Sequence, residues 1–89
     1  IAYEPIWTIG SDSAMNPREL EEMSIFIRKV LRDTFGVYAE DTKILYGGSV
    51  DRVNADSLVK EGNVSGLLIG RESLKPKVFI EIMKLVDSI

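Results

Sequence analysis

Two short, uninterrupted apolar runs constrain the fold of this chain more than any other feature. They cover residues 43–46 and 66–70, and each is too short to be a helix. Their hydrophobicity is continuous and does not alternate, which is typical of strands that are covered on both faces. A third strand is predicted over residues 1–4, where the chain begins with Ile-Ala-Tyr-Glu. We therefore expect three buried strands.

Segments with a helical period lie between and after these strands. The clearest helix is predicted from Pro17 to Phe35. Asn16 is expected to cap its first turn, proline suits the first helical position, and Gly36 supplies a left-handed end. Apolar residues at helical spacing form the stripe that this helix is expected to bury: Leu20, Met23, Ile27, Val30 and Leu31.

Two further helices are predicted. One covers residues 55–61, with Asn54 as its cap and Gly62 as its end. The other begins at Pro76 and carries a similar apolar stripe: Val78, Phe79, Ile82, Met83 and Val86.

The order of elements predicts the fold class. Strands that alternate with helices imply right-handed crossovers and a parallel sheet, so the class is α/β. Three such strands leave two open sheet edges, and the chain starts inside a strand. We therefore expect residues 1–89 to form a single segment of a larger domain. We expect the isolated chain either to be poorly ordered or to associate with copies of itself through those edges.

Composition excludes several functions. The chain has 11 basic and 14 acidic side chains, for a net charge of −3, which disfavours nucleic-acid binding. It has no histidine and no cysteine, so neither a serine–histidine nor a cysteine–histidine pair exists, and a zinc site is not expected. No apolar run approaches the ~18 residues of a membrane span. We expect a soluble cytoplasmic protein without a metal or a cofactor.

Glycines follow each predicted strand, at the edge of a parallel sheet where ligands bind. They are Gly10, Gly47, Gly48 and Gly70, and Ser49 adds a hydroxyl donor. Their backbone N–H groups would suit a phosphate. The alternative is structural, because tight turns between strands and helices need glycine as well.

Glu4 ends the first apolar strand and is followed by proline, with Trp7 nearby. A carboxylate held there and removed from water is a candidate general base. The alternative is a solvated carboxylate at a strand end, with Trp7 as a packing residue. The loop at residues 8–15 is either a mobile lid or an ordinary connection.

Three blocks of sequence resemble the triosephosphate isomerase family. They are Ala-Tyr-Glu-Pro-Ile-Trp at residues 2–7 with Thr-Ile-Gly after it, Tyr-Gly-Gly-Ser-Val at 46–50, and Gly-Leu-Leu-Ile-Gly at 66–70 with Ser-Leu-Lys-Pro after it. They occur in the family's order and spacing, over essentially all 89 residues. The resemblance implies that the chain is the part of a (β/α)8 barrel that holds strands 6–8.

The resemblance also implies an activity and roles for the site residues. The family interconverts two triose phosphates in glycolysis and gluconeogenesis, and Glu4 matches the base that moves a proton through an enediolate. The main-chain donors to the substrate phosphate match Gly10, Ser49, Gly70 and Arg71. Residues 5–15 match the closing lid, and its first hinge matches Pro5, Ile6 and Trp7. Ile9 and Leu68 match the apolar clamp over the base. Tyr46 matches the tyrosine that bonds the closed lid.

Two departures from the family pattern lie near the phosphate. Asp12 replaces a glycine of the lid tip and brings a negative charge. Arg71 stands where the family has a second glycine, and its side chain is expected to pair with Glu72, with another nearby acid, or with the phosphate itself.

The family's electrophilic lysine, histidine and asparagine belong to earlier strands that this chain lacks, and the same holds for the loops of the family's dimer interface. We therefore expect a homodimeric parent enzyme and an inactive isolated chain. The alternative is a stand-alone phosphate-binding or self-assembling module without catalysis.

Overall fold

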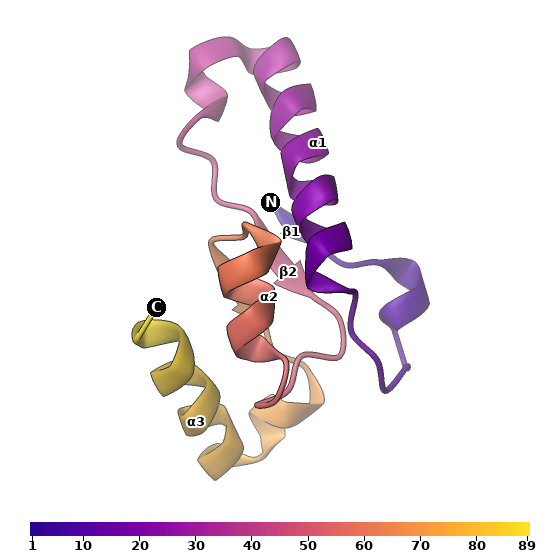
Figure 1. The fold of residues 1–89 in the computed structure, drawn as a ribbon, viewed down its shortest axis with the longest axis vertical. Coiled ribbons are helices and arrows are strands. Elements are labelled where there is room, and N and C mark those ends of the chain that lie inside the picture. The colour runs from indigo at the N-terminus through magenta and orange to yellow at the C-terminus, as the bar shows by residue number, and fades with distance from the viewer.

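A computed structural model describes all 89 residues, and its three strands form one parallel sheet (Figure 1). The strands are β1 (Ala2–Tyr3), β2 (Leu45–Gly47) and β3 (Gly66–Leu68), in the order β1-β2-β3. The register pairs Tyr3 with Tyr46 and Tyr46 with Leu67. The predicted parallel α/β arrangement is therefore confirmed.

Each strand is shorter than predicted. The first stops before Glu4, because Pro5 has no N–H to continue a ladder. The third stops at Leu68, two residues before Gly70. The second begins at Leu45 and not at Lys43, and it extends one residue beyond its predicted end, to Gly47.

Helices follow the strands as predicted, with short 3-10 turns between them. The helices are α1 (Pro17–Phe35), α2 (Ala55–Gly62) and α3 (Pro76–Asp87), and the turns are η1 (Ile6–Thr8), η2 (Gly36–Ala39) and η3 (Arg71–Leu74). In Figure 1, α1 and α2 lie side by side over the sheet, and α3 follows at the α2 side. No helix is both long enough and apolar enough to span a bilayer.

The ends of α1 are those that the sequence predicts. The side chain of Asn16 accepts a hydrogen bond from the Arg18 N–H at the start of the helix. Gly36 ends it with a φ of 67°, which glycine adopts without strain.

The predicted cap of α2 is wrong. The Asn54 side chain does not bond to the first turn of the helix. It accepts from the Asp51 N–H and donates to the Ser49 carbonyl, so it closes the loop before the helix instead. The helix does end at Gly62, but the left-handed residue is Asn63. Glycine is needed at position 62 for packing, because a Cβ there would lie 2.6 Å from Leu20 Cδ2.

One core lies between the helices and one face of the sheet. It is formed by Met15, Leu20, Ile44, Tyr46, Val50, Ala55, Leu58, Val64 and Ile82. Four residues of the predicted helical stripes are neither part of this core nor packed against it: Val30, Leu31, Phe79 and Met83. Of these, Val30 is 47% exposed and Met83 is 55% exposed.

The two faces of the sheet differ. Tyr46 points to the helices and is fully buried, and Tyr3 and Leu67 pack against the same core. The opposite face is only partly covered, because Ala2 is exposed and Leu68 is half-buried. The prediction that the strands are covered on both faces is therefore wrong for this chain.

Candidate active site

A cavity of ≈ 390 Å³ lies at the carboxyl ends of the three strands. It brings together most of the residues that the sequence singles out: Glu4, Ile9, Gly10, Asp12, Gly47, Gly48, Ser49, Leu68, Gly70, Arg71 and Glu72. Four others, Pro5, Ile6, Trp7 and Tyr46, do not line it. The carboxylate and the candidate anion-binding loops thus share one end of the sheet, as ligand sites of parallel sheets do.

The Glu4 side chain lies across the end of the sheet, on the face opposite the helices. A Cβ at Gly47 would lie 3.0 Å from Glu4 Cγ and 3.2 Å from Glu4 Oε1. The same position is 3.2 Å from Leu68 Cβ, so these two side chains flank Gly47. Glycine at position 47 therefore makes room for the carboxylate, a role that differs from the anion binding predicted for it. Glu4 itself is solvent-exposed here.

The first part of the candidate lid has one buried, hydrogen-bonded residue and three exposed apolar residues. Thr8 is buried, and its hydroxyl donates to the Pro5 carbonyl at 2.7 Å. The apolar residues Ile6 and Trp7 point away from the core and are largely exposed. Ile9 reaches the cavity but is 66% exposed, so the apolar clamp with Leu68 is not closed over Glu4 in this structure.

Tyr46 connects the far end of the lid to β2. Its hydroxyl accepts from the Met15 N–H at 2.8 Å and donates to the Gly48 carbonyl at 3.0 Å. Burial raises the pKa of Tyr46, and the Met15 N–H partly opposes that shift by stabilising the phenolate. The structure therefore places this tyrosine against Met15, the last residue of the segment that the resemblance matches to a lid.

The loop after β2 bonds to the middle of the candidate lid. The Ser49 hydroxyl bonds to the carbonyls of Thr8 and Ser11. Gly48 has a φ of 143°, and a Cβ there would lie 2.3 Å from Thr8 Oγ1. The sequence predicted no role for Thr8 beyond its place in the candidate lid. Its buried hydroxyl carries no sequence signal, because threonine in a loop is common.

The side chain of Arg71 pairs with Asp12. Its Nη2 lies 3.4 Å from Asp12 Oδ1 and 3.3 Å from the Ser11 carbonyl oxygen. Glu72, which the sequence left open as a partner, pairs with Lys75 instead. The two residues that depart from the family pattern therefore contact each other across the mouth of the cavity.

Comparison with known proteins decides the family. The sequence model described as "Triosephosphate isomerase" matches residues 1–86. The chain belongs to the triosephosphate isomerase family. This membership agrees with the parallel α/β fold and with the motif resemblance on which the site was predicted.

Individual triosephosphate isomerases match over nearly the whole chain. The chain is 41% identical over 88 residues to that of Buchnera aphidicola, covering 99% of this chain and 35% of the relative. It is 46% identical over 85 residues to that of Candida albicans, covering 94% and 34%. It is 43% identical over 84 residues to that of Emericella nidulans, covering 93% and 33%. The chain thus spans about a third of the length of the curated relatives that it matches.

Proposed function

We propose that this chain supplies the general base, the lid and the phosphate-binding loops of a triosephosphate isomerase. Such an enzyme interconverts dihydroxyacetone phosphate and glyceraldehyde 3-phosphate. The supporting observation is that Glu4 lines one cavity together with Gly10, Ser49 and Gly70, which come from three different loops. In this proposal the three strands are the sixth to eighth of a (β/α)8 barrel.

Proton transfer is assigned to Glu4. The carboxylate takes a proton from the carbon next to the substrate carbonyl, which leaves an enediolate. The protonated carboxyl then returns a proton to the neighbouring carbon, while the hydroxyl proton of the substrate passes from one oxygen to the other, so the isomerisation as a whole consumes no proton. Glu4 packs against Gly47, which has no side chain, and Glu4 lines the cavity in which the substrate would bind.

In this proposal, main-chain N–H groups bind the phosphate of the substrate. These are the N–H groups of Gly10, Ser49, Gly70 and Arg71, residues that line the same cavity as Glu4. Glycine suits two of these positions, because no atom lies within 4 Å of a Cβ built on Gly10 or Gly70. A ligand can therefore approach the backbone closely there.

Closure is assigned to residues 5–15, with Pro5, Ile6 and Trp7 as the first hinge. On closure, Ile9 and Leu68 cover Glu4 and exclude water, which raises the basicity of a carboxylate. The exposure of Ile9 in this structure leaves room for that movement. Tyr46 secures the far end through Met15.

We further propose that the 89-residue chain alone does not catalyse the reaction, that the whole enzyme is a homodimer, and that it works in the cytoplasm. The chain contains no histidine, so it cannot supply the histidine electrophile of the family. Preorganised donors to the enediolate oxygen carry several kcal/mol of an enzyme's barrier reduction. Isomerase activity of the isolated chain above that of a Glu4→Gln variant would contradict this part.

A chimera tests the proposed function. In it, this chain replaces the stretch of the Candida albicans relative that it matches. We expect isomerase turnover, and we expect Glu4→Gln to lower kcat by about 10² to 10⁴, as removal of a general base does. Glu72→Gln is the matched control, because Glu72 lines the same cavity but bonds to Lys75. Equal kcat with glutamate and glutamine at position 4 would refute the proposal.

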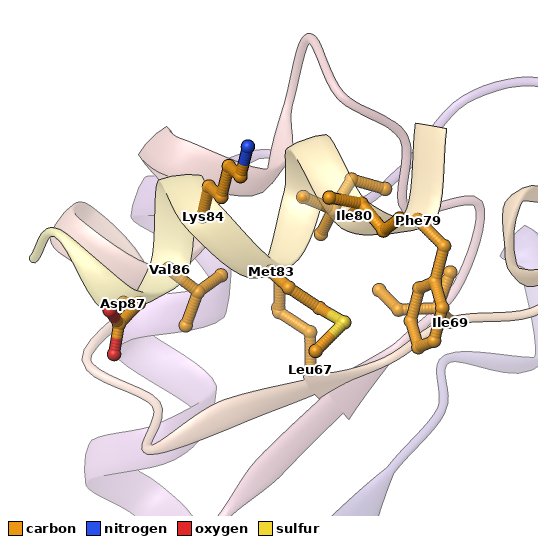
Figure 2. Close-up of a pocket in the computed structure, with 9 residues that line it drawn as sticks. Leu67, Ile69, Phe79, Ile80, Met83, Lys84, Val86 and Asp87 are labelled. Atoms are coloured by element: carbon orange, nitrogen blue, oxygen red, sulfur yellow. The ribbon is translucent and has the colours of Figure 1, made fainter. Parts of the chain in front are cut away.

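A second candidate, self-association of the isolated chain, is favoured by an apolar cavity of ≈ 630 Å³ that is lined by Leu67, Ile69 and residues of α3. In Figure 2, Met83 of α3 points toward Leu67, and Phe79 lies beside Ile69. This groove is continuous with the free edge of β3, which pairs only with β2. The occupant we propose is a second copy of the chain, because each copy also has the free edge of β1 to offer.

A further inference from the structure

The charge of the candidate active-site cavity is unfavourable for an anion. Four carboxylates line it, those of Glu4, Asp12, Asp51 and Glu72, and Arg71 is the one cation among the lining residues. Two of these carboxylates have partners of their own. Asp51 accepts from the Val53 and Asn54 N–H groups, and Glu72 pairs with Lys75. Arg71 is therefore the side chain that sets how well an anion is accepted.

Two side-chain donors of this cavity converge on one oxygen atom. The Ser49 hydroxyl, from the loop after β2, and Arg71 Nη2, from the turn after β3, both bond to the carbonyl oxygen of Ser11. The two donors therefore lie close together and face a common point. An oxygen of a bound phosphate at that point would receive both bonds, and the Ser11 carbonyl stands in for it here.

The present partners of Arg71 hold it weakly. The side chains of Arg71 and Asp12 are 67% and 96% exposed, and their closest approach is 3.4 Å. Exposed ion pairs of this kind contribute little to stability. A guanidinium bonds more strongly to a phosphate, through two parallel charge-assisted hydrogen bonds. The guanidinium is therefore free to exchange Asp12 for a ligand.

We propose that the guanidinium of Arg71 binds the phosphate group of the ligand directly, beside the main-chain donors, and that Asp12 is the counter-ion it leaves on binding. The ligand class, a small phosphate monoester, rests on the proposed function. Asp12 and the phosphate then compete for one cation, so the residues at positions 12 and 71 act as a coupled pair.

Inorganic phosphate is the probe, titrated into the 89-residue chain while the backbone amide signals of Gly10, Ser49 and Gly70 are followed by NMR. The variants are Arg71→Gln, Asp12→Asn and both together, which remove charge but keep the main-chain donors. Both side chains are exposed, so the substitutions leave the fold intact. Arg32→Gln is the matched control, because Arg32 is also 67% exposed and paired with an acid, Glu40, away from the cavity.

Arg71→Gln is expected to weaken phosphate binding about tenfold, whereas Arg32→Gln leaves it unchanged. Asp12→Asn is expected to strengthen binding several-fold, and that gain is expected to shrink when Arg71→Gln is also present. An unchanged phosphate affinity of the Arg71→Gln variant would overturn the role of the Arg71 side chain. The proposed binding of phosphate by main-chain donors would not be affected by that result. If Asp12→Asn strengthens phosphate binding equally with arginine and with glutamine at position 71, then Asp12 and phosphate do not compete for Arg71, and that part of the inference is overturned. If phosphate moves none of the three amide signals in the unmodified chain, the inference and the phosphate site of the proposed function both fail.

Discussion

The hydroxyl of Tyr46 lies 2.8 Å from the backbone nitrogen of Met15 and accepts its hydrogen bond. The two residues are 31 positions apart, and both are buried. One belongs to the central strand and the other to the end of the candidate lid. This bond therefore fixes where the lid returns to the body of the protein, while residues 5–12 remain largely on the surface.

Replacing Tyr46 with phenylalanine tests that bond. The change leaves the Met15 N–H buried without an acceptor, so we expect the free energy of unfolding to fall by about 1–3 kcal/mol. Urea denaturation followed by circular dichroism measures it. Tyr38→Phe is the control, because Tyr38 is 89% exposed and its loss of a hydroxyl should have no measurable effect. If the two substitutions lowered the free energy of unfolding equally, the buried bond between Tyr46 and Met15 would not contribute to stability.

The same tyrosine predicts how stability depends on pH. Burial raises the pKa of Tyr46 above its ordinary value of 10.0, so the folded state holds its proton more tightly than the unfolded state. The contribution of the protonated Tyr46 to the free energy of unfolding is therefore complete below about pH 10, and it is lost as the pH rises through the raised pKa. The unmodified chain should have a larger free energy of unfolding than the Tyr46→Phe variant, and this difference should shrink above about pH 10. The raised pKa of Lys29, caused by its bond to Asp33, affects both proteins alike and cancels. An advantage that stays constant as the pH rises would contradict the assignment.

Gly48 is predicted to tolerate no side chain. Alanine there would place a Cβ 2.3 Å from Thr8 Oγ1 and 2.9 Å from the Tyr46 hydroxyl, at a φ of 143°. We expect Gly48→Ala to lower the free energy of unfolding by more than about 2 kcal/mol. Gly70→Ala has open space and meets no clash, but its backbone, at φ −86° and ψ −111°, lies outside the helical and extended regions, so we expect a smaller loss of about 1 kcal/mol. Similar stabilities of the two variants, measured by urea denaturation, would disprove the close contact between the two loops.

Self-association of the isolated chain is expected through its open edges and the apolar groove of β3 and α3. Sedimentation velocity should show an average mass that rises with protein concentration. Met83→Lys places a charge in the groove and should weaken association about tenfold. Val53→Lys adds the same charge at an exposed loop outside the groove and should not. A mass that does not change with concentration would rule this association out.

Local signals explain which parts of the fold were predictable. The bounds of α1 follow from Asn16, Pro17 and Gly36, each of which acts within its own turn. The order of strands and helices follows from their hydrophobic periods. The cap of α2 was mispredicted because Asn54 has two partners in the preceding loop, and sequence alone does not rank such partners.

Other features depend on parts of the chain that are distant in sequence. Periodicity gives the apolar stripe of a helix but not its neighbours, so Met83 and Val30 were placed in a core that does not reach them. The pairing of Asp12 with Arg71 spans 59 positions and was only one of three options. The location of Glu4 beside the glycine loops was predictable, because parallel strands bring their carboxyl ends to one edge.

Deuterium transfer tests the central claim most directly. In D₂O, a base that moves a proton between two carbons through its own carboxyl group exchanges that proton with solvent and delivers deuterium to carbon. The chimera with the Candida albicans relative should therefore place deuterium on the carbons of the triose phosphate, as detected by proton NMR, and Glu4→Gln should nearly abolish this incorporation. Incorporation at the same rate in the chimera and in its Glu4→Gln variant would contradict the account, since another group would then be moving the proton.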